Sequence, residues 1–481
     1  MEDVRRDLDA FARIAKEHGG NRAAGTRGFD GSVAYVVAEL RRAGYAPAVQ
    51  RFTYPDWAER ITPEFARTAP KARPYVHGTD FVTMEYSGSG NVTARAVPVD
   101  VPATGQAGTA ACEAADFARF PRGAIALVQR GACEFSVKVA RARAAGASAM
   151  VIYNRPDARS VAGGTLKKQR ALPVVSTSYA IGSALVRAAR KGTLRLHVRT
   201  KAGTVRKRGA NVLADTPAGA PAGAPARAAG RVPGGVSGAA SGGAAGRVRG
   251  KASGGVLGRT SGGAAGRVVV VGAHLDSVPE GPGINDNATG VAVILSVARQ
   301  ISRTPLRNRV RFAFWGAEED GLRGSEHYVT TLSKAERAKI ALALNFDMLG
   351  SVNGVRGVYD GDASLGAEKD PPAGSGAIEA VFRDYYASRG LPVTDSPYTG
   401  RSDYGPFVKA GIPAGGMESG ADGNKTTAEV RTYGGKAGEP YDPCYHTMCD
   451  TVKNVDFTLL GTMADGVLHA VRHFGAAAEL P

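Results

Sequence analysis

The chain has 481 residues and a formal net charge of +17, with 43% apolar and 22% charged residues. This composition is that of a globular protein, and the length allows two or three domains with at least one large core. No apolar run reaches the roughly 18 residues that a bilayer requires, which excludes a membrane-spanning protein.

The basic charge raises the question of a nucleic-acid partner. Lysine and arginine are scattered along the chain, and no run interleaves them with aromatic residues as a groove for single strands would. We therefore expect a solvated basic surface, and neither a nucleic acid nor a membrane as partner.

Residues 1 to 50 predict two amphipathic helices, with Leu8, Phe11 and Ile14 at helical spacing in the first. Leu40 belongs to the apolar face of the second, and Ser32 is its expected N-cap. The N-terminus lacks the apolar core and the cleavage site of a signal peptide, so we expect that the given sequence carries none.

Residues 76 to 198 change to short β-rich runs broken by glycine and proline. Two buried strands, 123 to 131 and 147 to 154, enclose a helix, and a further strand follows at 172 to 178. We interpret residues 76 to 198 as a domain inserted into a main domain, which is formed by residues 1 to 75 and 199 to 481.

Residues 216 to 267 consist almost entirely of Gly, Ala, Pro, Ser and Arg, and the run SGGAAGRV begins at residue 241 and again at residue 261. They offer too little large apolar surface to offset the entropy of ordering the segment, so we expect a disordered loop. A basic interaction tail is the alternative interpretation.

Beyond residue 267, near-continuous apolar strands alternate with amphipathic helices. Strands are expected over 267 to 274, 309 to 318 and 339 to 348, with a helix over 289 to 301 after the first. This pattern predicts an α/β fold with a mixed, mostly parallel central sheet that helices cover on both faces.

Acidic and histidine side chains gather where these strands end, which is where α/β sheets bind their ligands. Carboxylates and imidazoles that converge without enough Lys or Arg would repel one another, and a divalent cation removes that cost. The candidates are His274, Asp286, Glu318, Glu319, Asp347 and His446.

Two histidines and three carboxylates without cysteine suit zinc, and they are too many for one tetrahedral ion and its water. They divide over two ions about 3.5 to 4 Å apart, with Asp286 as the expected bridge. Adjacent side chains point in different directions, so one of Glu318 and Glu319 can bind metal while the other takes a proton from the bound water. That chemistry is hydrolysis.

The four cysteines, Cys112, Cys133, Cys444 and Cys449, form no CxxC motif, which argues against a thiolate zinc site. They fall into two sequence-local pairs, which suggests two disulfides and an oxidising compartment outside the cell. Four reduced, buried thiols in a cytosolic enzyme are the alternative.

Five ordered motifs resemble the secreted bacterial zinc aminopeptidases with a co-catalytic two-metal site: GAHLDSVPEGPGINDNATG, FWGAEEDGLRGSEHY, NFDMLG, GRSDYGPF and DPCYHTMCDTVKN. A further stretch, GAIALVQRGACEFSVKVARARAAGASAMVIYN, resembles the protease-associated (PA) domain that is often inserted into these enzymes. The resemblance covers nearly the whole chain except the low-complexity loop. It implies a zinc-exopeptidase-like fold with an inserted PA domain.

Carried over by position, the resemblance implies that His274 and Asp347 bind one zinc, that Glu319 and His446 bind the other, and that Asp286 bridges them. The implied substrate is a peptide with a large apolar first residue, such as leucine. We expect a secreted monomer.

The same resemblance makes Glu318 the general base and Tyr445 the donor to the scissile carbonyl. It makes Asp276 a support that fixes the imidazole of His274. A histidine is expected where Tyr404 stands, so the substrate pocket is expected to differ in shape from that of the family. Weaker candidates for substrate contact are Arg401, Met348 and Phe407.

The cysteines fit the resemblance as well. A disulfide between Cys444 and Cys449 would restrict the motion of Tyr445 and His446. A disulfide between Cys112 and Cys133 would stabilise the PA-like domain.

Two alternatives stay open. A related two-zinc carboxypeptidase or dipeptidase would use the same metal ligands. A PA-domain binding protein with an inactive peptidase fold would lack some of those ligands, whereas this chain has all five and the base.

Overall fold

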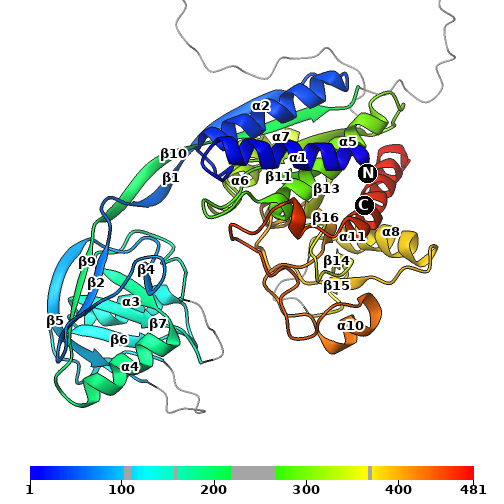
Figure 1. Ribbon diagram of the computed structural model, residues 1–481. Coiled ribbons are helices and arrows are strands. Elements are labelled where there is room, and N and C mark those ends of the chain that lie inside the picture. The colour runs from blue at the N-terminus through cyan, green and yellow to red at the C-terminus, as the bar shows by residue number, and fades with distance from the viewer. Residues whose placement is uncertain (102–109, 157–160, 218–266, 367–370) are drawn as a thin grey trace, which may run out of the picture. The chain divides into compact units, whose positions relative to one another are not determined.

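The computed structural model describes residues 1–101, 110–156, 161–217, 267–366 and 371–481 (Figure 1). The predicted loop 216–267 lies outside the described residues, apart from its ends. The chain forms two compact units, one of Met1–Phe52 with Arg208–Pro481 and one of Thr53–Lys207. The predicted insert, 76 to 198, lies within the second unit, which starts earlier because its sheet includes a strand at Glu64–Ala69.

The first unit is built on a mixed sheet of eight strands. Strands β11, β12, β13 and β16 run parallel, whereas β10 and β14 are antiparallel to β12 and β16. This confirms the predicted mixed, mostly parallel sheet. The spatial order is β1 (Ala48–Glu59), β10 (Ala202–Asp215), β12 (Arg309–Trp315), β11 (Val268–His274), β13 (Ile340–Asp347), β16 (Ala414–Glu418), β14 (Gly357–Tyr359) and β15 (Thr394–Ser396).

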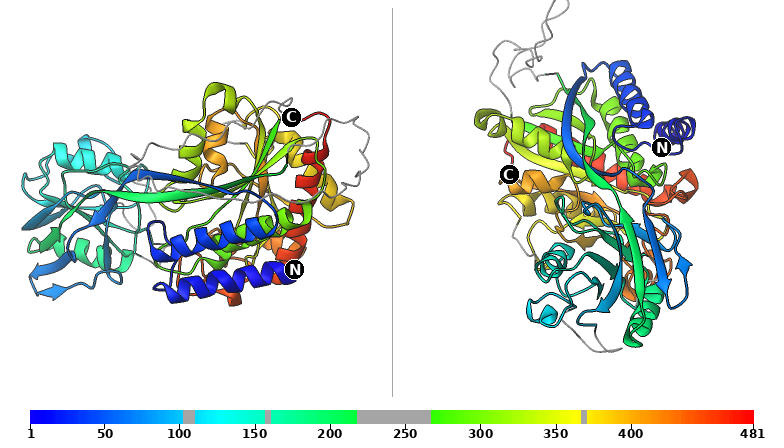
Figure 2. Two further views of the ribbon diagram at one scale, coloured as in Figure 1. Left: turned by 90° about the horizontal axis from the view of Figure 1, so that it is seen from above. Right: turned by 90° about the vertical axis from the view of Figure 1, so that its left-hand side faces the viewer.

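Helices cover both faces of this sheet because its central strands are apolar on both sides, and every residue of β11 is buried. Two helices, α6 (Arg323–Thr331) and α9 (Tyr404–Lys409), pack against one face. Figure 2 shows α1 and α2 side by side along the other face. The helices of that face are α1 (Glu2–Glu17), α2 (Arg27–Arg42), α5 (Thr289–Ile301), α8 (Ser375–Ala387) and α11 (Phe457–Ala476).

Shorter elements lie in the connections of the first unit. Helix α7 (Lys334–Arg337) precedes β13, and α10 (Thr427–Tyr433) follows β16. Two single turns, η2 (Ile284–Ala288) and η3 (Val452–Asn454), precede α5 and α11. Within the described residues, none of the helices combines the length and the apolar character needed to cross a bilayer.

The predicted start of α2 was wrong. The helix begins at Arg27, and the side chain of Thr26 caps it by accepting a hydrogen bond from the backbone N–H of Phe29. Ser32 lies inside the helix, where its hydroxyl donates to the carbonyl of Gly28. Both residue types favour an N-cap, so the spacing of apolar residues alone did not place the first turn.

The second unit has its own eight-stranded sheet. Helix α3 (Phe135–Ala144) packs on one face, α4 (Tyr179–Arg190) packs on the other, and a short turn η1 spans Ala115–Phe117. The predicted strands over 123–131, 147–154 and 172–178 are confirmed as β6, β7 and β8. The spatial order is β3 (Arg73–Pro74), β2 (Glu64–Ala69), β9 (Arg195–Thr200), β5 (Gly90–Pro98), β6 (Ile125–Gln129), β7 (Ala149–Tyr153), β8 (Val174–Thr177) and β4 (Phe81–Thr83).

A buried ion-pair cluster joins the N-terminal helices to α5. Asp7 is 0% exposed, and its carboxylate accepts hydrogen bonds from both terminal nitrogens of Arg299, at 2.7 and 2.8 Å. Arg299 also donates to Glu39 of α2 at 2.8 Å. One guanidinium therefore binds α1 and α2 to the central helix of this face.

Replacing Arg299 by methionine should lower the free energy of unfolding by about 3 kcal/mol, because the buried carboxylates of Asp7 and Glu39 lose the guanidinium that binds both. Tyr35 would still donate to Asp7, and Arg42 would still pair with Glu39. Asp3→Ala is the matched control, since Asp3 pairs with Arg6 at 2.5 Å on the surface. It should cost less than about 1 kcal/mol. Urea denaturation measures both, and equal losses would contradict the assignment.

Candidate metal centre

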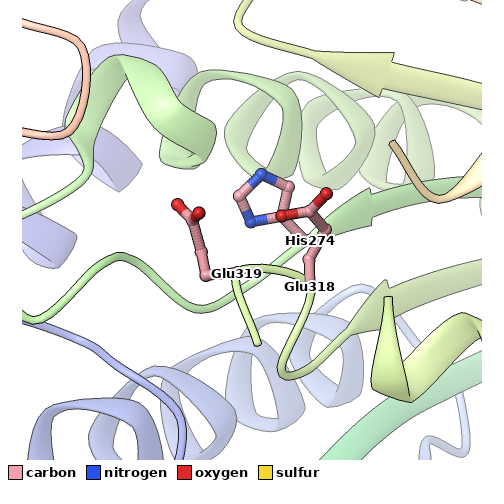
Figure 3. Close-up of side chains that lie close together, drawn as sticks. All are labelled: His274, Glu318 and Glu319. Atoms are coloured by element: carbon pink, nitrogen blue, oxygen red, sulfur yellow. The ribbon is translucent and has the colours of Figure 1, made fainter. Parts of the chain in front are cut away.

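The carboxyl ends of three neighbouring parallel strands meet at one edge of the first sheet. His274 is the last residue of β11 and Asp347 is the last residue of β13, while Glu318 and Glu319 follow the end of β12. Figure 3 shows Glu318 and Glu319 rising from one loop, with the imidazole of His274 between their carboxylates. Their ligand atoms lie within 4.8 Å of one another.

The predicted ligands form two groups that share Asp286. In the first group, Nε2 of His274 lies 3.0 Å from Oδ1 of Asp286 and 3.3 Å from Oδ1 of Asp347. In the second, Nε2 of His446 lies 3.2 Å from Oδ2 of Asp286 and 3.1 Å from Oε2 of Glu319. Each oxygen of Asp286 thus faces a different histidine, which is the arrangement expected of a carboxylate between two cations.

Two oxygen atoms of this cluster accept no hydrogen bond from the described residues, although Nε2 of His274 lies 3.3 Å from one of them. They are Oε1 of Glu319 and Oδ1 of Asp347, and both are buried. A buried carboxylate oxygen without a donor is costly unless a cation binds it. The donor set of imidazole and carboxylate is also one that zinc accepts, so the residues present fit zinc.

The pKa shifts of the cluster also indicate a site for cations. Burial would lower the pKa of His446, but its hydrogen bonds to Asp286 and Glu319 raise that pKa to about 10. Burial raises the pKa of Glu319 to about 7. It raises the pKa of Glu318 well above its usual range, although the charge of His274 opposes this rise. Carboxylates crowd here without enough positive charge, which divalent cations would supply.

The carboxylate of Asp276 was expected to fix the imidazole of His274, but its hydrogen bonds go elsewhere. The Nδ1 atom of His274 lies 3.2 Å from the backbone carbonyl of Asp276 and 3.9 Å from its carboxylate. The carboxylate instead accepts hydrogen bonds from the backbone N–H groups of Glu318, at 3.1 Å, and Glu319, at 3.3 Å. Asp276 therefore holds the loop that carries both glutamates.

Two further aspartates, which the sequence analysis missed, hold the turn that carries Asp286. The carboxylate of Asp450 accepts hydrogen bonds from the backbone N–H groups of Asn285, at 2.7 Å, and Asp286, at 3.1 Å. Asp442 accepts from the side chain of Asn285 at 2.6 Å. In the sequence, their one distinguishing feature is that they flank the two cysteines of the DPCYHTMCD motif, next to His446.

Asp347 is oriented by a neighbour from the GRSDYGPF motif. The hydroxyl of Ser402 donates to its Oδ2 atom at 2.6 Å, and the side chain of Asn345 donates to Ser402 at 2.8 Å. The other oxygen of Asp347, Oδ1, faces His274.

Tyr445 and His446 lie together in a loop closed by a disulfide. Cys444 is bonded to Cys449. The rings of Tyr445 and His446 stack with their centroids 3.8 Å apart. The second disulfide, Cys112–Cys133, lies in the second unit. Both pairs are those expected from the resemblance.

The candidates for substrate contact occupy different environments. The side chain of Arg401 is 65% exposed and lies 3.7 Å from Asp422. Met348 is buried directly after Asp347. Phe407 is 1% exposed and packs in the core against Trp315.

Tyr404 is also a packing residue. Its buried hydroxyl accepts hydrogen bonds from the backbone N–H groups of Thr399, at 2.9 Å, and Gly400, at 3.0 Å, and so holds the turn before Arg401.

Comparison with known proteins decides the family. The model of peptidase family M28 matches residues 255–471, and the model of the PA domain matches residues 92–185. An aminopeptidase of Pseudomonas aeruginosa (strain UCBPP-PA14) is 37% identical over 471 residues, which cover 97% of this chain and 79% of that protein. The chain belongs to peptidase family M28. This confirms the predicted family and the predicted inserted PA domain.

Other aminopeptidases match over most of their length. Leucine aminopeptidase 2 of Trichophyton tonsurans is 33% identical over 461 residues, which cover 95% of this chain and 80% of that protein. The solved structure of BSAP, a zinc aminopeptidase from Bacillus subtilis, matches with a TM-score of 0.68 and 23% identity. The match covers 98% of this chain and 95% of that one, and at this identity it shows the shared fold alone.

The two disulfides should differ in what their removal does to this M28 site. Replacing Cys444 and Cys449 by alanine should cost about 2 kcal/mol of stability by chain entropy and also weaken metal binding, because the freed loop carries His446. Replacing Cys112 and Cys133 should cost roughly 3 kcal/mol and leave metal affinity unchanged.

Urea denaturation and titration with Zn²⁺ measure the two effects separately. Wild-type zinc affinity in the Cys444→Ala/Cys449→Ala variant would contradict a positioning role for this disulfide.

Proposed function

We propose that the protein is a secreted aminopeptidase that uses two zinc ions to remove N-terminal residues from peptides. The observation that carries the proposal is the position of Asp286, with one oxygen toward His274 and the other toward His446. Membership of peptidase family M28 and relatives that are aminopeptidases support it. The two disulfides favour an oxidising compartment.

The ligands divide as the resemblance implies. His274 and Asp347 would hold one zinc, Glu319 and His446 would hold the other, and Asp286 would contact both. Zinc bound in such a site lowers the pKa of a bound water to about 7 and polarises the carbonyl oxygen of a substrate.

Glu318 is the proposed general base. It lies at the edge of the site beside Glu319 but outside both ligand groups that share Asp286. The loop that carries it is held by Asp276. Its carboxylate would accept a proton from the attacking water and pass that proton to the nitrogen of the leaving group.

Tyr445 is the proposed donor to the substrate carbonyl. Burial raises the pKa of its phenol, and the charges of Asp286 and Glu319 raise it further, so the hydroxyl keeps its proton at neutral pH. A neutral hydroxyl can donate a hydrogen bond to the carbonyl oxygen as negative charge develops there during attack.

A large apolar first residue, such as leucine, is the proposed substrate preference. Support comes from the relative named leucine aminopeptidase 2 and from the apolar side chain of Met348 next to Asp347.

Glu318→Gln should lower kcat by about 10²-fold or more on a leucine nitroanilide, because glutamine cannot accept the proton. Zinc content should stay at the wild-type value, since Glu318 is not a proposed ligand. Glu326→Gln is the matched control, because Glu326 lies in α6 with a half-exposed side chain and should leave the rate unchanged.

An N-acetylated nitroanilide should resist the wild-type enzyme, because an aminopeptidase requires a free amine. Wild-type turnover by Glu318→Gln with bound zinc would rule out the proposed base. Cleavage of the blocked substrate would favour another kind of peptidase.

A further inference from the structure

We propose that Arg22, in the loop between α1 and α2, is a positioning residue of the metal centre. Its guanidinium joins the backbone that follows His274 to the backbone that precedes Asp286. This inference rests on the proposed function, because those two residues are the proposed ligands from the β11–α5 connection.

Arg22 is 0% exposed, and its side chain donates only to backbone carbonyls in its described contacts. Nη1 donates to the carbonyl of Leu275, Nε donates to Pro282 at 2.9 Å, and Nη2 donates to Gly283 at 2.5 Å. Its backbone N–H donates to the hydroxyl of Ser277 at 2.9 Å. One side chain therefore binds both ends of the segment 275–283.

This connection has no regular secondary structure of its own. Between the end of β11 and the turn η2 the chain contains two prolines and two glycines, and Gly283 has a left-handed φ of 62°. A Cβ atom at Gly283 would lie 2.4 Å from the carbonyl oxygen of Asp286 and 3.1 Å from Nη2 of Arg22. The guanidinium is thus packed directly against the turn that carries Asp286.

The place of the guanidinium is fixed from the other side by the core. Its carbon atom lies 5.1 Å from the centre of the Phe11 ring, and Phe11 is fully buried in α1. The N-terminal helix therefore supports the guanidinium, and the guanidinium supports the two ends of the connection. A planar group with several fixed N–H donors can bind three carbonyls at once, whereas a lysine ammonium is a flexible point donor.

Arg22 also places a positive charge behind the carboxylates. Burial lowers its pKa to about 10, while the charges of Asp276, Asp450 and Asp286 oppose the decrease, so the guanidinium stays protonated at neutral pH. In the described contacts it donates to no carboxylate. Arg22 therefore does not bond to the ligand oxygens of Asp286, and it acts on their position through the backbone.

The test compares Arg22→Met, Arg22→Lys and the control Arg299→Met. The control removes another arginine of the same unit, whose side chain is 17% exposed and contacts no ligand segment. Zinc affinity is measured by competition with a chelator, together with kcat, KM and thermal stability. Arg22→Met should weaken zinc binding by about 10- to 100-fold and lower kcat more than it raises KM, because a misplaced ligand affects the reacting centre. Arg299→Met should lower stability and keep wild-type zinc affinity.

Arg22→Lys retains the charge and should fold, yet it should still bind zinc more weakly than the wild type. This variant carries the test if Arg22→Met does not fold. Wild-type zinc affinity in either folded Arg22 variant would overturn the positioning role and leave the proposed function intact. A wild-type protein that binds no zinc would overturn the proposed function, and this inference with it.

Discussion

Asp286 connects two parts of the chain that the sheet alone does not bring together. Parallel strands place His274 and Asp347 at one edge, but His446 comes from a disulfide-closed loop outside the sheet. The two oxygens of Asp286 face the two histidines at 3.0 and 3.2 Å. The proposed two-ion site and the choice of Glu318 as base depend on this contact.

The groups that hold the ligands in place act mainly on the backbone. Asp276 and Asp450 accept hydrogen bonds from backbone N–H groups of the ligand loops, and Arg22 donates to backbone carbonyls. This leaves ligand oxygens such as Oε1 of Glu319 without a donor among the described residues. A cluster built this way is short of positive charge, which is the condition that favours binding of divalent cations.

The sequence predicted the elements that end in ligands, because buried parallel strands have a strong apolar pattern and their polar ends stand out. Strand β11 and helix α5 lie where they were expected. Asp286 and His446 were predicted as ligands from their residue types, whereas the assignment of each ligand to one of the two ions came from the family resemblance. Arg22 and Asp450 were missed because a contact between a side chain and a distant backbone group leaves no periodic pattern in the sequence. The N-cap prediction was wrong because serine and threonine both favour that position, and the apolar spacing does not choose between Ser32 and Thr26.

The most direct test of the central claim is the number of zinc ions that the wild-type chain binds. Purified protein is stripped with a chelator, equilibrated with a slight excess of Zn²⁺, freed of unbound metal and analysed by atomic emission alongside an Asp286→Ala variant. We expect two ions per chain in the wild type and fewer than two in the variant. A wild-type chain that holds one ion or none, or a variant that keeps two, would contradict the two-ion site at Asp286.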